Sequence, residues 1–565
     1  MDIGTISLVL MLGLLLLLAI GMPLGLASAI LAVAVLVMRF EPALLTAPWT
    51  FGEGTLTGRP GSGPLNILAQ RIYGLLTDYV LISIPLFIFM AALLERSGVA
   101  KEMYSSLSVW LNRTRGGIAI VTSIMAVIMA AMSGIIGGEV VLLGLIALPQ
   151  MLRLGYNQNL AIGVICASGS LGTMIPPSIV LIIYGLITET SIKALFTASF
   201  IPGFMLASFF IIYIIIRTNL NPTQAPFPDE RIKESLVGLD PNSKEAMALQ
   251  EELAEFESQP AGREKAGYFF AFLTVVIAGF TAALTLRAMF FEFSGSNAAN
   301  TGEPAFWGTA EYIYIFGGIF AAAMAVIYLV FGKDRTVKGW SMGKGLVPPI
   351  VVIGVVMGSI YGGITGITEA AGMGALAVFV IALFRGEASF ELVWESLMRT
   401  LKSTGTIIWV TIGATALAGA YTIAGGPTYV ADFIVGSELP TMMVILMMML
   451  ILLFMGAFMD WVGIVLLIIP VFLPIVLRLP IEEIGVFGEL NPRHVAIWFG
   501  VVFCMNMQVS FLSPPFGPAA FYLKSVAPPH IALTDIFKGF LPFIGIQLIA
   551  LSVLLLYPPI VSILL

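Results

Sequence analysis

Long apolar runs separated by short polar segments fill the chain from one end to the other. A run of about 20 apolar residues is long enough to cross the hydrocarbon part of a bilayer as a helix. The pattern therefore predicts an all-α polytopic membrane protein. Simple spans are expected near residues 6–38, 80–94, 194–216, 268–288, 312–331, 346–361, 372–383, 404–423 and 541–560.

One apolar stretch, residues 163–185, cannot be a single helix. It reads GVICASGSLGTMIPPSIVLIIYG and contains no Lys, Arg, Asp or Glu. The small residues between Ser168 and Gly172 favour turns, and the pair Pro176-Pro177 cannot continue a helix from its amino-terminal side. Unpaired backbone at membrane depth is tolerated only where protein or a water-lined cavity satisfies it. We therefore predict a broken transmembrane helix at about 159–188, with its interruption facing a polar site.

The same construction returns at about 494–524, which contains VVFCMNMQVSFLSPPFGPAAFYLK. Cys504 precedes Pro514 by ten residues. Cys166 precedes Pro176 by the same number, so the two copies are offset by 338 residues (504 − 166). A broken helix in each half of a membrane protein is the sequence pointer to the binding site of a secondary transporter built from inverted repeats.

Each predicted broken helix follows an apolar stretch that is too long and too interrupted for one span. The first, about 118–152, contains Ser133-Gly134 and a single acid, Glu139. The second, about 441–477, contains Gly456 and Asp460. We predict a re-entrant helical hairpin at each place, with the small residues at its tip.

Composition supports this reading, since 59% of the residues are hydrophobic and only 11% are charged. Such a chain is not an ordinary soluble protein. The two cysteines give no disulfide framework and no metal-binding spacing. One segment departs from this apolar composition, namely an acidic hydrophilic insert at 218–265. It is too short to form a core of its own. It divides a first membrane half, 1–217, from a second, 266–565.

Two other polar segments have a predicted place at the membrane boundary. Residues 101–115 are amphipathic and suit a helix lying at the membrane surface. Residues 333–344 contain four basic side chains and are expected to form a cytoplasmic loop by the positive-inside bias.

The interruptions supply groups suited to a cation and an anion. Unwound carbonyls with Ser, Thr and Asn oxygens can replace the hydration shell of Na⁺, and helix amino termini favour anions. Candidates for a first Na⁺ site are Ser133, Gly134, Ser168, Gly169, Ser170 and Gly172. Candidates for a second Na⁺ site are Asp460, Gly463, Ser510 and Ser513. Candidates for substrate binding are Thr173, Asn506, Gln508 and Glu139.

Other roles stay open for these residues. Small residues also let membrane helices pack closely, without binding anything. The intramembrane acids Glu139 and Asp460 could bind Na⁺, carry protons or pair with each other, and Glu139 could also face an interface. Apart from Na⁺ as a coupling ion, no metal, other cofactor or nucleic acid is expected.

Several motifs together resemble the large membrane subunit of tripartite ATP-independent periplasmic (TRAP) transporters, a DctM-like permease. They are AIGVICASGSLGTMIPPSIVLIIYG, GGITGITEAAGMGA, GAFMDWVGIVLLIIPVFLPIV and SFLSPPFGPAAF. The resemblance implies a multi-pass protein of the bacterial inner membrane with an elevator-type, ion-transporter-superfamily-like fold. It implies Na⁺-coupled uptake of an organic acid, a C4-dicarboxylate or another carboxylate. It also implies two protein partners, a small four-helix membrane subunit (DctQ-like) and a periplasmic solute-binding protein (DctP-like).

The sequence departs from the family pattern at Glu139, at Gly366-Ile367 and in the length of the insert. One alternative is a stand-alone ion-coupled organic anion transporter or exchanger of the same superfamily. A more remote one is an intramembrane enzyme, which would need a metal site or paired catalytic groups. No HExxH motif occurs and the buried acids are far apart in sequence, so we expect no enzymatic activity.

Overall fold

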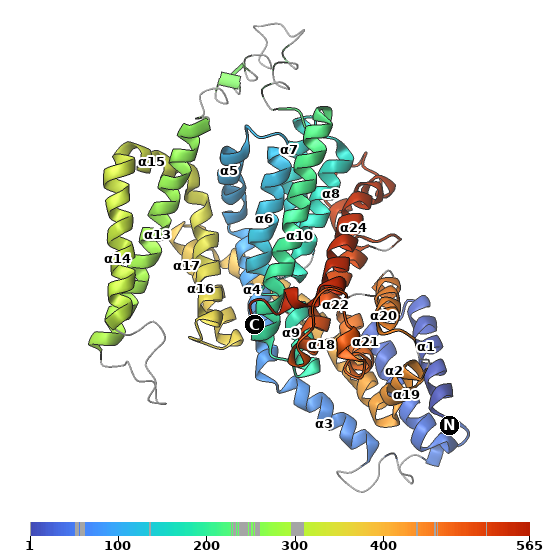
Figure 1. Ribbon diagram of the computed structural model, residues 1–565. Coiled ribbons are helices and arrows are strands. Elements are labelled where there is room, and N and C mark those ends of the chain that lie inside the picture. Colours follow the sequence, from blue (N-terminus) through green and yellow to red (C-terminus); the bar gives the residue numbers. More distant parts are fainter. Residues whose placement is uncertain are drawn as a thin grey trace.

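The computed structural model describes residues 2–50, 56, 63–134, 137–227, 262–294, 310–436, 439–456, 459, 461–515 and 517–565, with isolated residues between 229 and 260. All regular structure in these residues is helical (Figure 1). The α-helices are α1 (Ile3–Ala19), α2 (Leu24–Phe40), α3 (Pro64–Leu76), α4 (Ser83–Arg96), α5 (Val99–Leu111), α6 (Gly117–Ser133), α7 (Gly138–Arg153), α8 (Gln158–Gly169), α9 (Ile179–Thr188), α10 (Ile192–Leu220), α13 (Gly262–Phe293), α14 (Ala310–Val326), α15 (Gly332–Gly343), α16 (Val347–Tyr361), α17 (Ile367–Phe384), α18 (Phe390–Ala424), α19 (Gly426–Val435), α20 (Thr441–Gly456), α21 (Trp461–Val476), α22 (Val495–Leu512), α23 (Pro518–Lys524) and α24 (Leu533–Leu556).

The described residues contain eight helical stretches that are long and apolar enough to cross a bilayer. Six more apolar helices have only 10–17 residues, among them α6, α9, α20 and α21. Large apolar side chains cover much of the outer surface; Leu329 is 85% exposed and Phe384 is 88% exposed. This distribution suits lipid rather than water as the surrounding solvent. The prediction of an all-α multi-span membrane protein is confirmed, while inverted repeats and re-entrant hairpins stay predictions.

Two details of the sequence prediction were wrong. The apolar run 6–38 is two helices rather than one, because Gly21 adopts a φ of +83° and Pro23 then provides the amino-terminal cap of α2. The basic segment 333–344 is not a loop, because most of it forms α15.

The interior is organised around α22, in which every residue except Ala496 is buried. The Tyr184 hydroxyl of α9 donates to the carbonyl of Ala496 at 2.7 Å. On another side, the Trp498 indole donates to the carbonyl of Leu554 in α24 at 3.1 Å. The first of these bonds places parts of the chain more than 300 residues apart side by side. In Figure 1, α8, α9, α22 and α24 occupy the body of the molecule, whereas α13 and α14 form a separate arm.

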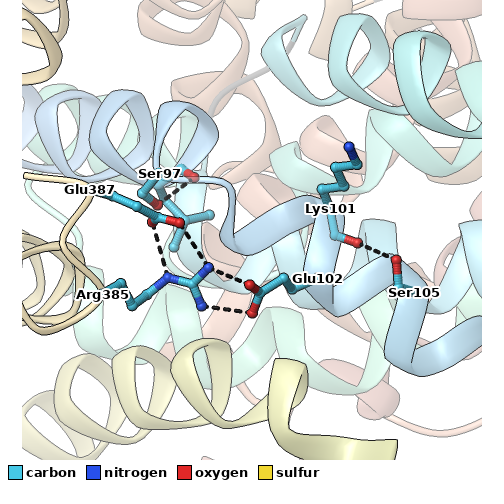
Figure 2. A network of polar contacts seen from close by, with 7 residues as sticks. Ser97, Lys101, Glu102, Ser105, Arg385 and Glu387 are labelled. Carbon is cyan, nitrogen blue, oxygen red and sulfur yellow. Dashed lines mark hydrogen bonds and ion pairs between the residues drawn. The ribbon is translucent and has the colours of Figure 1, made fainter.

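An ion-pair cluster ties α5 to the segment between α17 and α18 (Figure 2). The Arg385 guanidinium donates two hydrogen bonds to the Glu102 carboxylate, each of 2.7 Å. It also donates to both carboxylate oxygens of Glu387 at 3.0 Å. The hydrogen bonds from Arg385 hold the pKa of Glu102 below its usual value, although partial burial opposes them.

Replacing Glu102 by Gln tests this cluster. A carboxylate with a lowered pKa adds stability above its unfolded-state pKa and loses it as the pH falls through the folded-state value. Because the pair is solvent-screened, we expect E102Q to cost at most about 1 kcal/mol at pH 7. The difference from wild type should begin to shrink near pH 4.3, roughly the ordinary Glu pKa, and should be much smaller at about pH 3 than at pH 7, because the folded-state pKa is lower still. Thermal unfolding in detergent at both pH values measures this. The exposed Glu482→Gln variant is the control, and a difference that persists at low pH would contradict the assignment.

Candidate functional site

The first interruption lies where the sequence placed it, between α8 and α9. The α-helix ends at Gly169, and residues Ser170–Thr173 form a single 3₁₀ turn. The chain then passes through a cis bond between Pro176 and Pro177 before α9 begins. Ser178 joins the two parts, because its hydroxyl donates to the carbonyl of Thr173 at 2.6 Å and accepts from the amide of Leu181 at 3.5 Å. The side chain thus caps α9 and satisfies a carbonyl left open by the break.

The turn between α6 and α7 packs directly on this break. The amide of Ile179 donates to the carbonyl of Gly134 at 3.4 Å. Gly134 has a φ of +57°, and a Cβ added to it would lie 2.2 Å from the carbonyl oxygen of Pro177. Only glycine combines this left-handed backbone with so close an approach. The turn therefore supplies one of the acceptors that the interrupted helix needs.

A buried carboxylate stands at the same junction. Glu139, in the first turn of α7, has no exposed surface. Its Oε1 accepts a hydrogen bond from the Ser133 hydroxyl, and its Oε2 has no hydrogen-bond partner within the described part of the chain. A Cβ on Gly172 would lie 2.9 Å from Oε1, so the 3₁₀ turn abuts the carboxylate. An unpartnered carboxylate oxygen in an apolar interior is costly unless a cation or a proton accompanies it.

An ion pair from two other helices lies against the beginning of α7. Glu95 of α4 and Arg399 of α18 are paired, and the Glu95 side chain is only 8% exposed. A Cβ on Gly138 would lie 2.3 Å from Glu95 Oε1 and 2.8 Å from Arg399 Nη2. Charged groups of α4 and α18 therefore approach the residue next to Glu139. This ion pair was not predicted, because no sequence feature distinguishes Glu95 and Arg399 from ordinary surface charges.

Two of the residues predicted for the first Na⁺ site face other partners. The hydroxyl of Ser168 lies 2.9 Å from that of Ser123 on α6. A Cβ on Gly169 would lie 2.5 Å from Val140, so this glycine allows close packing of α7 on α8. The structure therefore brings together Ser133, Gly134, Gly172 and Glu139, and places Ser168 and Gly169 in packing contacts beside them.

Ser170 forms a second polar cluster, which joins the two halves of the chain. Its hydroxyl accepts from Gln547 Nε2 of α24 at 3.2 Å, and its single proton is within reach of both the Ala167 carbonyl at 2.7 Å and Gln508 Oε1 of α22 at 3.1 Å. All three side chains are buried. Ser170 and Gln508 are separated by 338 residues, which is the offset between the two proline-containing copies. Corresponding positions of the two copies therefore touch each other in space.

Gln547 is a residue that the sequence analysis missed. Its side-chain amide stands alone in the apolar run 541–560. A polar residue within an apolar membrane segment is the one sequence feature that could have indicated a functional role. Gln508 Nε2 and Gln547 Oε1 have no hydrogen-bond partner among the described residues. One donor and one acceptor thus remain available beside Ser170.

The second interruption follows α22, which ends at Leu512. An extended Ser513 and a cis bond between Pro514 and Pro515 separate it from α23. Ser513 donates to the carbonyl of Val509 at 2.7 Å. Unlike the first interruption, this one exposes both prolines.

Near this break, α20 packs closely on α22. A Cβ on Gly456 would lie 2.3 Å from Cβ of Ser510, and Asn506 Nδ2 donates to the carbonyl of Met449 at 3.1 Å. A cavity of about 20 Å³ lies beside Gly456, Trp461 and Ser510. That volume holds about one water molecule or small ion.

Three further predicted residues remain, two of which the structure describes. Gly463 packs against α2, since a Cβ there would lie 2.1 Å from Leu24. Asp460 lies outside the described residues. Thr173 donates to the carbonyl of Ser170 at 3.0 Å and so stabilises the 3₁₀ turn.

The two interruptions are neighbours in space. A Cβ on Gly137, in the α6–α7 turn, would lie 2.8 Å from the ring of Tyr522 on α23. A Cβ on Gly144 of α7 would lie 2.9 Å from Leu523. The α6–α7 turn and α7, which pack on the first break, therefore contact α23, the helix that follows the second break.

Comparison with known proteins identifies the family. The family model for the tripartite ATP-independent periplasmic transporter, DctM component, matches residues 11–560. The chain belongs to this family. Membership confirms the resemblance seen in the sequence, and it identifies a TRAP transporter permease rather than an enzyme.

Two named TRAP transporter proteins agree with this membership, and one solved structure was also found to be similar. The C4-dicarboxylate TRAP transporter large permease protein DctM of Pseudomonas aeruginosa is 24% identical over 88% of this chain and 88% of its own length. The isethionate TRAP transporter permease protein DctMQ of Oleidesulfovibrio alaskensis is 22% identical over 88% of this chain and 60% of its own. A crystal structure of the YdaH transporter of Alcanivorax borkumensis aligns with a TM-score of 0.46 at 14% identity, covering 94% of this chain and 97% of that chain.

Replacing Gly134 by Ala tests the junction of the TRAP permease directly. The left-handed backbone alone costs about 1–2 kcal/mol for a residue with a Cβ, and the contact with Pro177 adds to it. We expect a lower unfolding temperature and impaired transport. Gly318→Ala in α14 is the matched control, because nothing lies within 4 Å of its added Cβ and Ala favours a helix. Equal stability of the two variants would show that the junction is not built as described.

Proposed function

We propose that this TRAP permease performs Na⁺-coupled uptake of an organic acid, a C4-dicarboxylate or another carboxylate. The solute is delivered by a periplasmic solute-binding protein, and the permease works in the inner membrane with a small four-helix subunit. Named relatives support this, since the proteins from P. aeruginosa and O. alaskensis are named for C4-dicarboxylate and isethionate, both of which are anions. The fused DctMQ protein supports a small-subunit partner.

The observation that carries the coupling is the buried contact between Ser133 and Glu139. A carboxylate oxygen without a partner among the described residues, beside a hydroxyl and the 3₁₀ turn at Gly172, is a favourable place for a small cation. We therefore assign Glu139 to the first Na⁺ site and not to the substrate, because its charge would repel an anion. Gly134 belongs to the same site, with Ser168, Gly169 and Ser170 shaping it from α8 and the 3₁₀ turn.

A second Na⁺ is proposed beside Ser510 and Ser513, where the small cavity next to Gly456 gives room for one ion. Asp460 and Gly463 remain candidates for this second site on sequence grounds. The substrate carboxylate is proposed to lie between the two ion sites. Gln508 supports this placement, because its Nε2 is a buried donor without a partner among the described residues. Thr173 and Asn506 would line the same space.

For the mechanism, we propose two inverted repeats in which each helix pair, α6–α7 and α20–α21, is a re-entrant hairpin that moves with the neighbouring broken helix. Cations bound first at each turn would order it, so that the anion meets a formed site. The contact between Ser170 and Gln508 supports this arrangement, because it joins corresponding positions of the two copies. The alternative of a stand-alone exchanger lacks comparable support, since the matching family is a tripartite one.

Uptake by proteoliposomes tests the proposal. The full chain is reconstituted with its small subunit, and the loaded binding protein is added outside. We expect uptake to require an inward Na⁺ gradient. Losing a charged ligand costs about 1.5–3 kcal/mol, so Glu139→Gln should raise the Na⁺ concentration for half-maximal uptake by about tenfold or more. Ser133→Ala and Ser170→Ala should raise it less.

The exposed Ser525→Ala variant controls for nonspecific effects and should match wild type. Uptake that is unchanged when choline replaces Na⁺ would refute the coupling. Wild-type Na⁺ dependence in both E139Q and S133A would refute the ligand assignment while leaving the coupling intact.

A further inference from the structure

A cavity of about 500 Å³ opens between α5 and the first turns of α13. Its walls are almost entirely apolar and include Leu107, Trp110, Ile124, Phe269, Phe270 and Leu346. The rings of Trp110 and Phe269 meet edge to face, with centroids 5.3 Å apart. The volume falls within the range of about 300–1,000 Å³ that is typical of small-molecule sites.

One basic side chain, Lys265, lines this cavity, and two others lie near Lys265 or one helical turn from it. Lys265 lines the cavity, and its Nζ donates to Asn112 Oδ1 at 2.7 Å. Arg113 lies close enough to act electrostatically on Lys265. One turn further along α13, Lys338 of α15 lies over the ring of Tyr268 at 5.3 Å. An acid, Glu264, is also present, and it accepts a hydrogen bond from the Tyr268 hydroxyl at 2.6 Å.

The wall formed by α5 is fixed before any ligand arrives. Arg385 holds Glu102 from one side through two hydrogen bonds (Figure 2). From another side, Gly345 packs so closely that an added Cβ would lie 2.5 Å from the carbonyl oxygen of Glu102 and 2.6 Å from Ser106 Oγ. The cavity between α5 and α13 is therefore bounded by an anchored helix, which favours binding by lowering the cost of ordering.

An apolar cavity with a cationic side chain in its wall matches an amphiphile with an anionic head and apolar tails. We infer that this cavity binds an anionic phospholipid, with its phosphate at Lys265 and Arg113 and its acyl chains along the aromatic wall. Basic pockets between membrane helices on the cytoplasmic side are suited to such headgroups. The clustered basic residues of α13, α15 and the α5–α6 turn also place this end of the molecule on the cytoplasmic side by the positive-inside bias. The site is independent of the ion and substrate sites proposed above.

Native mass spectrometry of the purified full-length chain tests this site. The protein is exchanged into detergent with equal amounts of phosphatidylglycerol and phosphatidylethanolamine. We expect wild type to retain phosphatidylglycerol preferentially. Lys265→Gln should lower that retention about fivefold, since a basic residue near a lipid headgroup contributes about 1 kcal/mol. Lys265→Arg should restore it.

Three further variants separate the contributions of charge, hydrogen bonding and cavity space to lipid retention. Lys333→Gln removes an exposed charge from the same basic region but outside the cavity lining, and it should change retention by less than twofold. Asn112→Ala removes the Lys265 hydrogen bond but keeps the charge, so retention should persist. Ala266→Trp fills the cavity and should reduce retention of both lipids.

Two outcomes would overturn the inference. The first is equal retention of both lipids by wild type, or unchanged phosphatidylglycerol retention in K265Q. The second is cross-linking of an Ala266→Cys variant to the small membrane subunit, because a protein helix would then occupy the cavity. The native cysteines do not interfere, since Cys166 and Cys504 are both buried.

Discussion

A helix that stops inside an apolar protein leaves amide and carbonyl groups without partners, and these must be satisfied by other parts of the chain. At the break between α8 and α9, the partners are Ser178, Thr173 and the turn at Gly134. The turn cannot move away without exposing an acceptor and a donor. Stability of the fold and formation of the proposed ion site therefore depend on the same few contacts.

The two interruptions share a sequence pattern but not an environment. The stretch from Ser168 to Gly185 is entirely buried, whereas Pro514 and Pro515 are exposed. The contact of Ser170 with Gln508 nevertheless brings the two copies together at corresponding positions.

The sequence predicted the interruptions because proline and small residues act locally on the backbone. It could not predict Gln547, whose contact with Ser170 spans 377 residues, nor the approach of Arg399 to α7. It named Glu139 as a substrate candidate, with Na⁺ binding as an alternative, but it did not predict the contacts of this acid with Ser133 and Gly172. Nor could it predict the close approach of Gly463 to Leu24 of α2. Except for the contact between Ser133 and Glu139, these contacts join residues that are far apart in the chain, and no local sequence pattern records them.

Hydrogen–deuterium exchange tests the central claim most directly, namely that the α6–α7 turn and the first break form one cation-binding unit. The amides of residues 133–139 and 170–179 are followed in NaCl and in an equal concentration of choline chloride. A bound cation should order both segments, so their exchange should slow together in Na⁺, while α14 shows no change. Identical exchange of both segments in the two salts would contradict the account.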